Sequence, residues 1–111
     1  MNGFVILDKG EGVTSFRASA CLRRIYGEKK TGHTGTLDPM ATGVLPVALG
    51  KATRFIDFLP LSEKGYTAKF KFGIITDTLD ITGKILSQKE VNVSEEEVLS
   101  VIPRFTGNIM Q

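Results

Sequence analysis

Cysteine, histidine and long apolar runs are scarce in this sequence of 111 residues. Its single cysteine, Cys21, cannot form a disulfide within the chain, which is typical of a protein from a reducing compartment. Because His33 is the only histidine, the chain alone cannot assemble a zinc site from Cys and His ligands. No apolar run approaches the length that is needed to span a bilayer.

Targeting signals and cofactor motifs are also missing. The first residues, MNGFVILDKGEG, place no basic residue before their apolar stretch, so we expect no signal peptide and a cytoplasmic protein. There is no Walker A motif and no G-x-S-x-G elbow. Asp77 and Asp80 lack the spacing of a calcium loop. We therefore expect no metal, no cofactor and no membrane association.

Charge is distributed unevenly along the chain. Residues 1–71 hold 11 Lys and Arg against 6 Asp and Glu, a balance of +5, whereas residues 72–111 hold 3 against 6, a balance of −3. A basic first part indicates a polyanionic partner, but it also fits an unevenly charged solvated surface. Because no basic run is long, charge alone leaves both interpretations open.

The first half of the sequence predicts strands around one helix. Apolar runs predict buried strands at residues 3–8 and 44–49, and Pro46 predicts an edge or bulge for the second strand. A helix is expected from a cap at Thr14 or Ser15 to about Tyr26, with an apolar face of Ala18, Leu22 and Ile25. Residues 27–42 read as a long polar connection, and residues 51–59 as a short helix.

The second half adds strands and a final helix. Strict alternation predicts an amphipathic strand at residues 66–72, and a turn leads to another strand near residues 84–87. Ser94 and Glu97 form a capping box for a helix that runs to about Ile102. The whole pattern predicts one unit of the α+β class, with a mixed, mainly antiparallel sheet and flanking helices.

The chemically richest segment is the loop at residues 31–43, TGHTGTLDPMATG. Its glycines permit tight turns and a close approach of a ligand to the backbone. Pro39 biases Asp38 toward an extended conformation, in which a carboxylate can face a cleft and act as a nucleophile or base. The same residues also fit a plain turn with glycine punctuation.

Four blocks of sequence decide between these interpretations. They are GFVILDKGEGVTS (3–15), GHTGTLDPMATGVLPVALGKATR (32–54), KGYTAKFKFGIITDTLDITG (64–83) and FTGNIMQ (105–111). With these blocks the chain closely resembles the tRNA pseudouridine synthase B family of bacterial-type enzymes. The resemblance implies a pseudouridine-synthase-like fold and isomerisation of uridine to pseudouridine in the T loop of tRNA, at position 55, without a cofactor.

The resemblance also implies roles for single residues. Asp38 aligns with the catalytic aspartate, His33 with a histidine that contacts RNA where the target base has left the stack, and Tyr66 with the aromatic residue that packs on the uracil. Lys9 is expected to support the loop rather than to react, although it also fits a surface lysine. The neighbours of Asp38 in the motif are expected to contact the substrate as well; they are Gly35, Thr36 and Leu37. Phosphate contacts are expected from basic residues of the first part, with Arg23, Arg24, Lys29, Lys30 and Lys64 as candidates.

Two departures from the family pattern are visible. Gly10 stands where the family usually has proline, which loosens a turn without touching the chemistry. The family's chain also continues beyond the last block, so we expect residues 1–111 to be the N-terminal part of the catalytic domain. The C-terminal half and an RNA-binding accessory domain would be absent, and the fragment alone would be inactive.

Two other readings remain open at this point. One is a non-catalytic module that binds or folds tRNA, in which the loop grips the RNA and the chemistry is secondary. The other keeps the chemistry and changes the substrate to that of a related synthase guided by a small RNA. Asp38 separates the first from an enzyme, because a carboxylate at the centre of a site contributes nothing to binding an anion.

Overall fold

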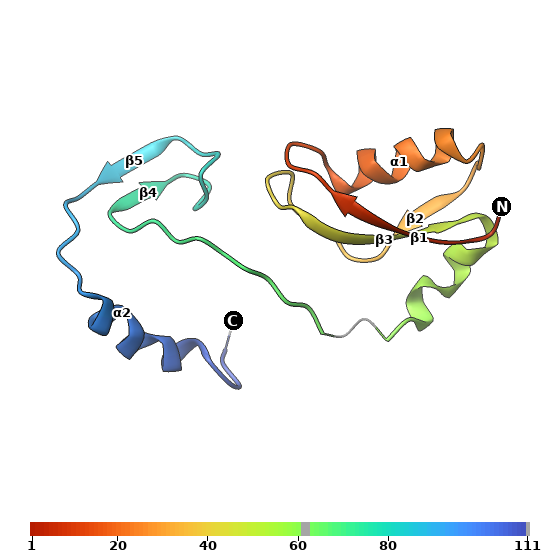
Figure 1. Cartoon of the computed structure of the whole chain (residues 1–111). Coiled ribbons are helices and arrows are strands. Elements are labelled where there is room, and N and C mark those ends of the chain that lie inside the picture. Colours follow the sequence, from red (N-terminus) through yellow and green to blue (C-terminus); the bar gives the residue numbers. More distant parts are fainter. Residues whose placement is uncertain (61–62, 111) are drawn as a thin grey trace. The chain divides into compact units, whose positions relative to one another are not determined.

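A computed structural model of the chain describes residues 1–60 and 63–110. Gln111, the last residue of the fourth sequence block, lies outside the described residues. Residue contacts divide the chain into two units, Met1–Gly65 and Tyr66–Gln111, which are coloured red to green and green to blue in Figure 1. This division differs from the single unit that the sequence predicts, because no Gly-rich or Pro-rich linker marks the boundary.

The first unit is built on a three-stranded antiparallel sheet. Its strands β1 (Gly3–Lys9), β3 (Gly43–Leu49) and β2 (Thr31–His33) lie in that order, as Figure 1 shows. In β1 and β3 the register runs from the pair of Gly3 and Leu49 to the pair of Lys9 and Gly43. The sheet therefore has two ends, one at Gly3 and one at Lys9.

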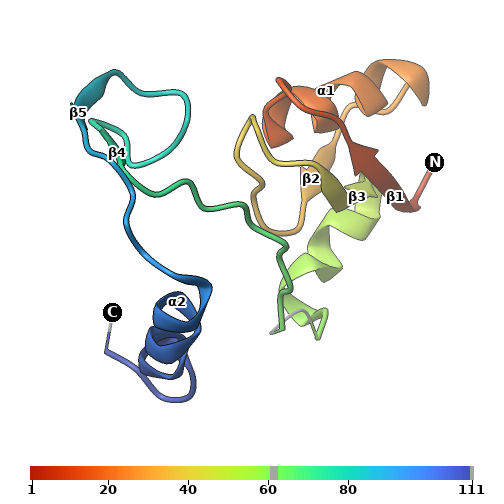
Figure 2. The same cartoon turned by 60° about the vertical axis from the view of Figure 1, so that its left-hand side comes forward.

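Helix α1 (Ser15–Ile25) packs on one face of this sheet (Figures 1 and 2). Thr14 caps it, as expected, by accepting a hydrogen bond from the backbone N–H of Arg17 at 3.1 Å. The core joins the two elements; its buried residues are Ala18, Leu22, Leu45, Val47 and Leu49. Ile25, predicted for the apolar face, is 68% exposed instead; it stands at the last helical position and lines an open groove together with Leu7 and Leu22.

Strand β3 is central, so the edge position predicted from Pro46 is wrong. The lack of an N–H at Pro46 is tolerated because β2 ends there, at His33. The Pro46 carbonyl accepts the N–H of Thr34 at 3.0 Å, and this bond closes the pairing of β2 with β3. Strand β2 itself lies inside residues 27–42, which the sequence predicts as an unbroken connection.

After β3 the chain turns at Gly50 into η1 (Gly50–Phe58), a 3₁₀ helix where a short helix is expected. Gly50 has φ +60°, the left-handed region that favours glycine. Because side chains alternate along a strand, Ala48 points away from α1. It is fully buried, and η1 contacts all three strands.

The second unit contains the strands β4 (Ile74–Thr76) and β5 (Ile85–Gln88), paired antiparallel, and the helix α2 (Glu95–Val101), which continues as η2 (Ile102–Phe105). The capping box of α2 is present, with both hydrogen bonds between Ser94 and Glu97. In the turn between the strands, Asp80 accepts bonds from Thr78 and Thr82, which lower the pKa of its carboxyl.

Residues 66–72 do not form the predicted strand. Residues 66–71 belong to neither a helix nor a strand, and Phe72 already belongs to the turn before β4. The segment pairs with no other described segment, and its aromatic side chains are exposed, by 68% at Tyr66, 82% at Phe70 and 53% at Phe72. Alternation prepares a strand for pairing, but a strand forms only against a partner. The α+β class with antiparallel sheets is confirmed all the same.

In residues 1–60 and 63–110 we find no helix with the length and the apolar character that crossing a membrane requires.

Candidate active site

Asp38 stands in the loop that leads from β2 to β3, at the Lys9 end of the sheet. The Asp38 carbonyl accepts the N–H of Ala41 at 2.9 Å, so Asp38 and Pro39 open a tight turn. The side chain of Asp38 is exposed, and no ion pair or hydrogen bond engages it among the residues that the structure describes. The turn reading and the site reading are therefore compatible, because the turn presents a free carboxylate.

The residue before Asp38 is fastened to the start of α1. Ser15, only 2% exposed, donates its hydroxyl to the Leu37 carbonyl at 3.1 Å and accepts the Leu37 N–H at 2.9 Å. Leu37 also packs its side chain against the core under α1. Both backbone polar groups and the side chain of Leu37 are thus engaged, which leaves this side of Asp38 little freedom to move.

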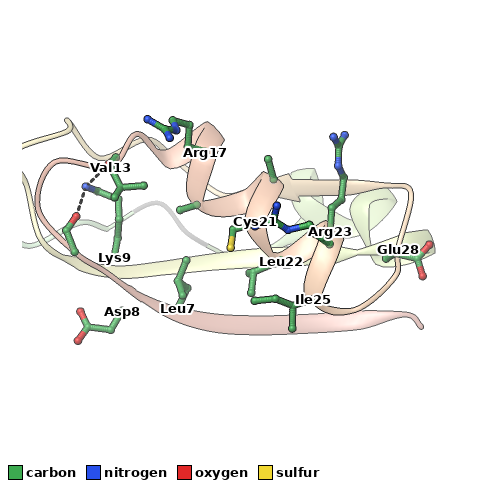
Figure 3. A pocket seen from close by; sticks show the side chains of 14 residues that line it. Leu7, Asp8, Lys9, Val13, Arg17, Cys21, Leu22, Arg23, Ile25 and Glu28 are labelled. Atoms are coloured by element: carbon green, nitrogen blue, oxygen red, sulfur yellow. Dashed lines mark hydrogen bonds between the residues drawn. The ribbon is translucent and has the colours of Figure 1, made fainter.

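The residue after Asp38 is fastened to the end of β1. The Pro39 carbonyl accepts the Lys9 Nζ at 3.2 Å and the Gly12 N–H at 2.7 Å. Lys9 also donates to the carbonyls of Gly10 at 2.9 Å and Val13 at 2.7 Å; Figure 3 shows its ammonium group turned toward the backbone at Val13. One side chain therefore ties the turn after β1 to the loop that carries Asp38.

Lys9 is 1% exposed, so it is not a surface lysine. An ammonium group has three N–H donors, and the three carbonyl acceptors use all of them. A buried cation without such partners would be strongly unfavourable. With no donor left over, Lys9 is suited to hold the loop rather than to exchange protons with a substrate.

Gly35 shapes the first part of the loop. Its φ of +70° lies in the left-handed region, and the Nζ of Lys64 lies 3.3 Å from the point where a Cβ would stand. Glycine is therefore favoured at this position by the backbone conformation, whereas the flexible end of Lys64 can move aside for a Cβ.

We expect Gly35→Ala to lower activity about tenfold or more while leaving the fold intact, since strain in the loop displaces Asp38 and small displacements of a reacting group are costly. Gly10→Ala is the matched control, because a Cβ at Gly10 meets nothing and its φ is not left-handed. Initial rates for both variants, measured beside their melting temperatures, check this. Equal rates for the two variants would show that the conformation at Gly35 does not matter.

The other predicted site residues fall in both units. His33 ends β2 and is half-buried, opposite Val47, while Thr36 lies exposed in the loop. Tyr66 belongs to the second unit and is exposed, so it does not pack with Phe70 and Phe72 in a core. Within the first unit the structure brings the loop and Lys9 together. His33 ends β2 on the other side of β3, where it pairs with Val47, four residues along β3 from Gly43, the partner of Lys9.

A groove of about 900 Å³ runs along α1, but Asp38 does not line it. Figure 3 shows part of its wall, with Arg17 and Arg23 at the rim and Leu7 and Leu22 on the apolar side. The carboxylate therefore stands outside this groove, in an open loop.

Sequence reasoning missed the anchor at Ser15. The sequence offers Thr14 and Ser15 equally as the cap of α1, but only one residue can cap a helix. In the structure Thr14 caps α1, and Ser15 lies buried at the first helical position. A buried hydroxyl needs a partner, and the backbone of Leu37 supplies it. The two consecutive hydroxyl residues at the start of the helix, Thr14 and Ser15, are the sequence feature from which this anchor could have been predicted.

Comparison with known proteins places these features in a family context. Residues 23–111 match the model described as "TruB family pseudouridylate synthase (N terminal domain)". The whole chain aligns at 51% identity with tRNA pseudouridine synthase B of Geotalea uraniireducens and at 47% with that of Clostridium tetani. Among solved structures, a chain in the crystal structure of a Cbf5-Nop10-Gar1 complex is 30% identical to this one, with a TM-score of 0.66. The alignment covers 98% of the present chain and 28% of the matched chain.

The chain covers only part of these relatives. It spans 36% of the length of the Geotalea protein and 39% of the Clostridium tetani protein. The alignments thus cover the whole of this chain but less than half of each relative.

Proposed function

Because the chain belongs to the TruB family of pseudouridylate synthases, we propose that it carries the catalytic aspartate of an enzyme that isomerises uridine to pseudouridine in the T loop of tRNA. The observation that carries the proposal is the anchoring of Asp38 between Leu37 and Pro39, with its carboxylate left free. Relatives at 47–51% identity bear the name tRNA pseudouridine synthase B.

The reaction asks little of the protein besides placement. The N1–C1′ bond of the nucleoside breaks, the uracil turns and C5 bonds to C1′. The hydrogen on C5 is released as a proton, and N1 takes up a proton, so the product is an isomer of the substrate. Nothing is oxidised and no group is imported. A carboxylate held by fixed neighbours can be placed beside the sugar–base junction, and the anchoring of Leu37 and Pro39 supports this role for Asp38.

The target base must leave the RNA loop before Asp38 can reach it, since the sugar–base junction is shielded in a stacked loop. We assign His33 to the space that the base vacates, and Tyr66 to the face of the displaced uracil. An aromatic face of this kind contributes roughly 1–3 kcal/mol per stacked base. The backbone around Gly35 and Thr36, and Leu37 beside Asp38, line the approach to the carboxylate.

A basic partner would orient the Asp38 carboxylate through charge-assisted hydrogen bonds. No cation forms an ion pair with it in residues 1–60 and 63–110. We propose that the partner lies in the part of the relatives that this chain does not span, together with an RNA-binding accessory domain. Residues 1–111 are then the N-terminal part of the catalytic domain, in a protein of the cytoplasm.

We expect the 111-residue chain alone to be inactive and the extended protein, in which this chain is continued by the remaining length of its relatives, to be active. Tritium placed on C5 of uridine is released to water only when C5 bonds to C1′, so tritium release from a labelled T stem-loop RNA measures the reaction. Tritium release by the isolated chain would refute the proposal that residues outside this chain are needed for the reaction. No release by the extended protein would refute the proposed function.

The reading as a guided synthase is less well supported. The relatives named for tRNA are 47–51% identical over the whole of this chain, whereas the Cbf5-Nop10-Gar1 structure, which covers 98% of it, is 30% identical. Tritium release from tRNA without any added guide RNA would decide for the stand-alone enzyme.

A further inference from the structure

A cluster of basic side chains lines a hollow at the Gly3 end of the sheet, opposite the end that carries Asp38. The hollow measures about 390 Å³. Lys30 comes from the segment just before β2, and Lys51 and Arg54 come from η1. In Figure 1 this end is marked by the N-terminus and the start of η1. We call these three residues the basic triad.

The triad lacks a counter-ion of its own. Glu28 is the one carboxylate that lines the hollow, and it already accepts the amino group of Met1 at 2.7 Å. The hydrogen bond from that amino group is the main cause that lowers the pKa of Glu28. In the part of the chain that the structure describes, no side chain of the triad forms a hydrogen bond or an ion pair. Three like charges therefore face one hollow, and an anion there would relieve their repulsion.

The backbone beneath the triad is fixed. The Gly50 N–H donates to the Lys30 carbonyl at 2.8 Å, and the Lys51 N–H donates to Asn2 Oδ1 at 2.7 Å. A Cβ at Gly50 would stand 2.5 Å from the same Asn2 oxygen, so no larger residue fits there. The three basic side chains consequently start from a rigid frame, which reduces the entropy lost when they bind a ligand.

We propose that the basic triad binds the phosphodiester backbone of the substrate RNA stem, as a second anchor remote from the reacting uridine. The proposal rests on the proposed function, because it assumes that the RNA loop occupies the Asp38 end. Phosphate suits the donors, since a guanidinium can bind it through two parallel N–H groups and the ammonium groups add point charges.

The spacing of the two ends fits a stem that adjoins the loop. Six residue steps along β1 separate Gly3 from Lys9, which is roughly 20 Å at about 3.3 Å per step. An A-form RNA stem of several base pairs spans a comparable length. The triad therefore lies within the reach of a short stem that adjoins the loop.

The test is the salt dependence of RNA affinity in the extended protein. We expect Lys30→Gln, Lys51→Gln and Arg54→Gln together to weaken binding of a T stem-loop RNA about tenfold or more at low salt. The slope of log affinity against log salt is negative, and its magnitude should decrease by about 2–3, since each lost phosphate contact removes about 0.7–0.9. Fluorescence anisotropy with labelled RNA measures both quantities, and the melting temperature shows that the variant is folded.

The matched control removes three other basic residues, Lys84, Lys89 and Arg104, and changes the net charge equally. It should leave affinity and slope nearly unchanged.

An RNA whose stem is cut to the pairs next to the loop should bind wild type and triad variant alike. An equal loss in the control, an unchanged slope in the triad variant, or a loss that persists with the cut stem would overturn the proposal. Inorganic phosphate at the same concentration as the phosphate groups of the RNA should displace none of the labelled RNA; displacement at that concentration would assign the triad to free phosphate and overturn the proposal. Tritium release by the wild type tests the proposed function separately, so the two can fail independently.

Discussion

Asp38→Asn in the extended protein should reduce uridine isomerisation by a factor of about a thousand or more, which corresponds to roughly 4 kcal/mol of transition-state stabilisation. The asparagine keeps the size of the side chain and the turn made by the Asp38 carbonyl. It removes the negative charge and the nucleophilic oxygen. The carboxylate forms no contact that holds the fold in the described residues, so stability and RNA affinity should change little. Tritium release and anisotropy, measured on the same preparation, separate the two effects.

Asp57→Asn is the control for this substitution. Asp57 is an exposed carboxylate on η1, and neutralising it changes the net charge by the same amount. We expect its rate to stay within about twofold of the wild type. If Asp38→Asn keeps normal turnover, the loop is not the catalytic site. If it loses RNA binding and turnover together, the loop is better described as an RNA grip, which is the non-catalytic reading.

Lys9→Met should lower the free energy of unfolding of the chain by roughly 2–5 kcal/mol. Methionine fills nearly the same volume but leaves the carbonyls of Gly10, Val13 and Pro39 without their shared donor, and each unsatisfied buried polar group costs about 1–3 kcal/mol. The loop also loses its link to β1, so the rate should fall by about a hundredfold where the variant is still folded. Thermal unfolding and tritium release measure the two losses.

Lys29→Met provides the comparison, because Lys29 is an exposed lysine whose side chain forms no hydrogen bond among the described residues. Its unfolding free energy should change by no more than about 0.5 kcal/mol. A Lys9→Met protein that loses activity with unchanged stability would mean that Lys9 takes part in the reaction. One that keeps both would mean that the buried hydrogen bonds contribute nothing.

The helix caps and the first strand could be predicted from the sequence, because each depends on residues that are close together in the chain. The cap at Thr14, the capping box of Ser94 and Glu97, and the apolar run of β1 all lie in the structure where the residues place them. These features depend on neighbours within a few positions along the chain, which is why they can be read without a structure.

Features that depend on distant partners could not be read in this way. Pro46 argued for an edge strand, yet β3 pairs with both β1 and β2. Pro46 is tolerated in this central strand because β2 stops one residue short of it. Alternation at residues 66–72 argued for a strand, yet no described segment pairs with it. In both cases the deciding fact is where another strand lies, and composition carries no record of that.

The candidate site shows the same division. The loop and Asp38 were predictable as a Gly-rich turn around one carboxylate, and the resemblance to the family supplied the roles. The anchoring by Ser15 and Lys9 was not predictable, because it joins residues 22 and 30 positions apart in the sequence. Burial of a lysine, in particular, runs against the usual exposure of that residue and becomes visible only when its three acceptors are seen together.

The central claim is that Asp38 sits in the active site of a uridine isomerase acting on the T loop of tRNA. The most direct measurement is nucleoside analysis of a tRNA transcript incubated with the extended protein, followed by mapping of the modified position. We predict one pseudouridine per tRNA, located in the T loop, with wild type and none with Asp38→Asn. An unmodified transcript with the wild-type protein, or equal pseudouridine with both proteins, would contradict this account.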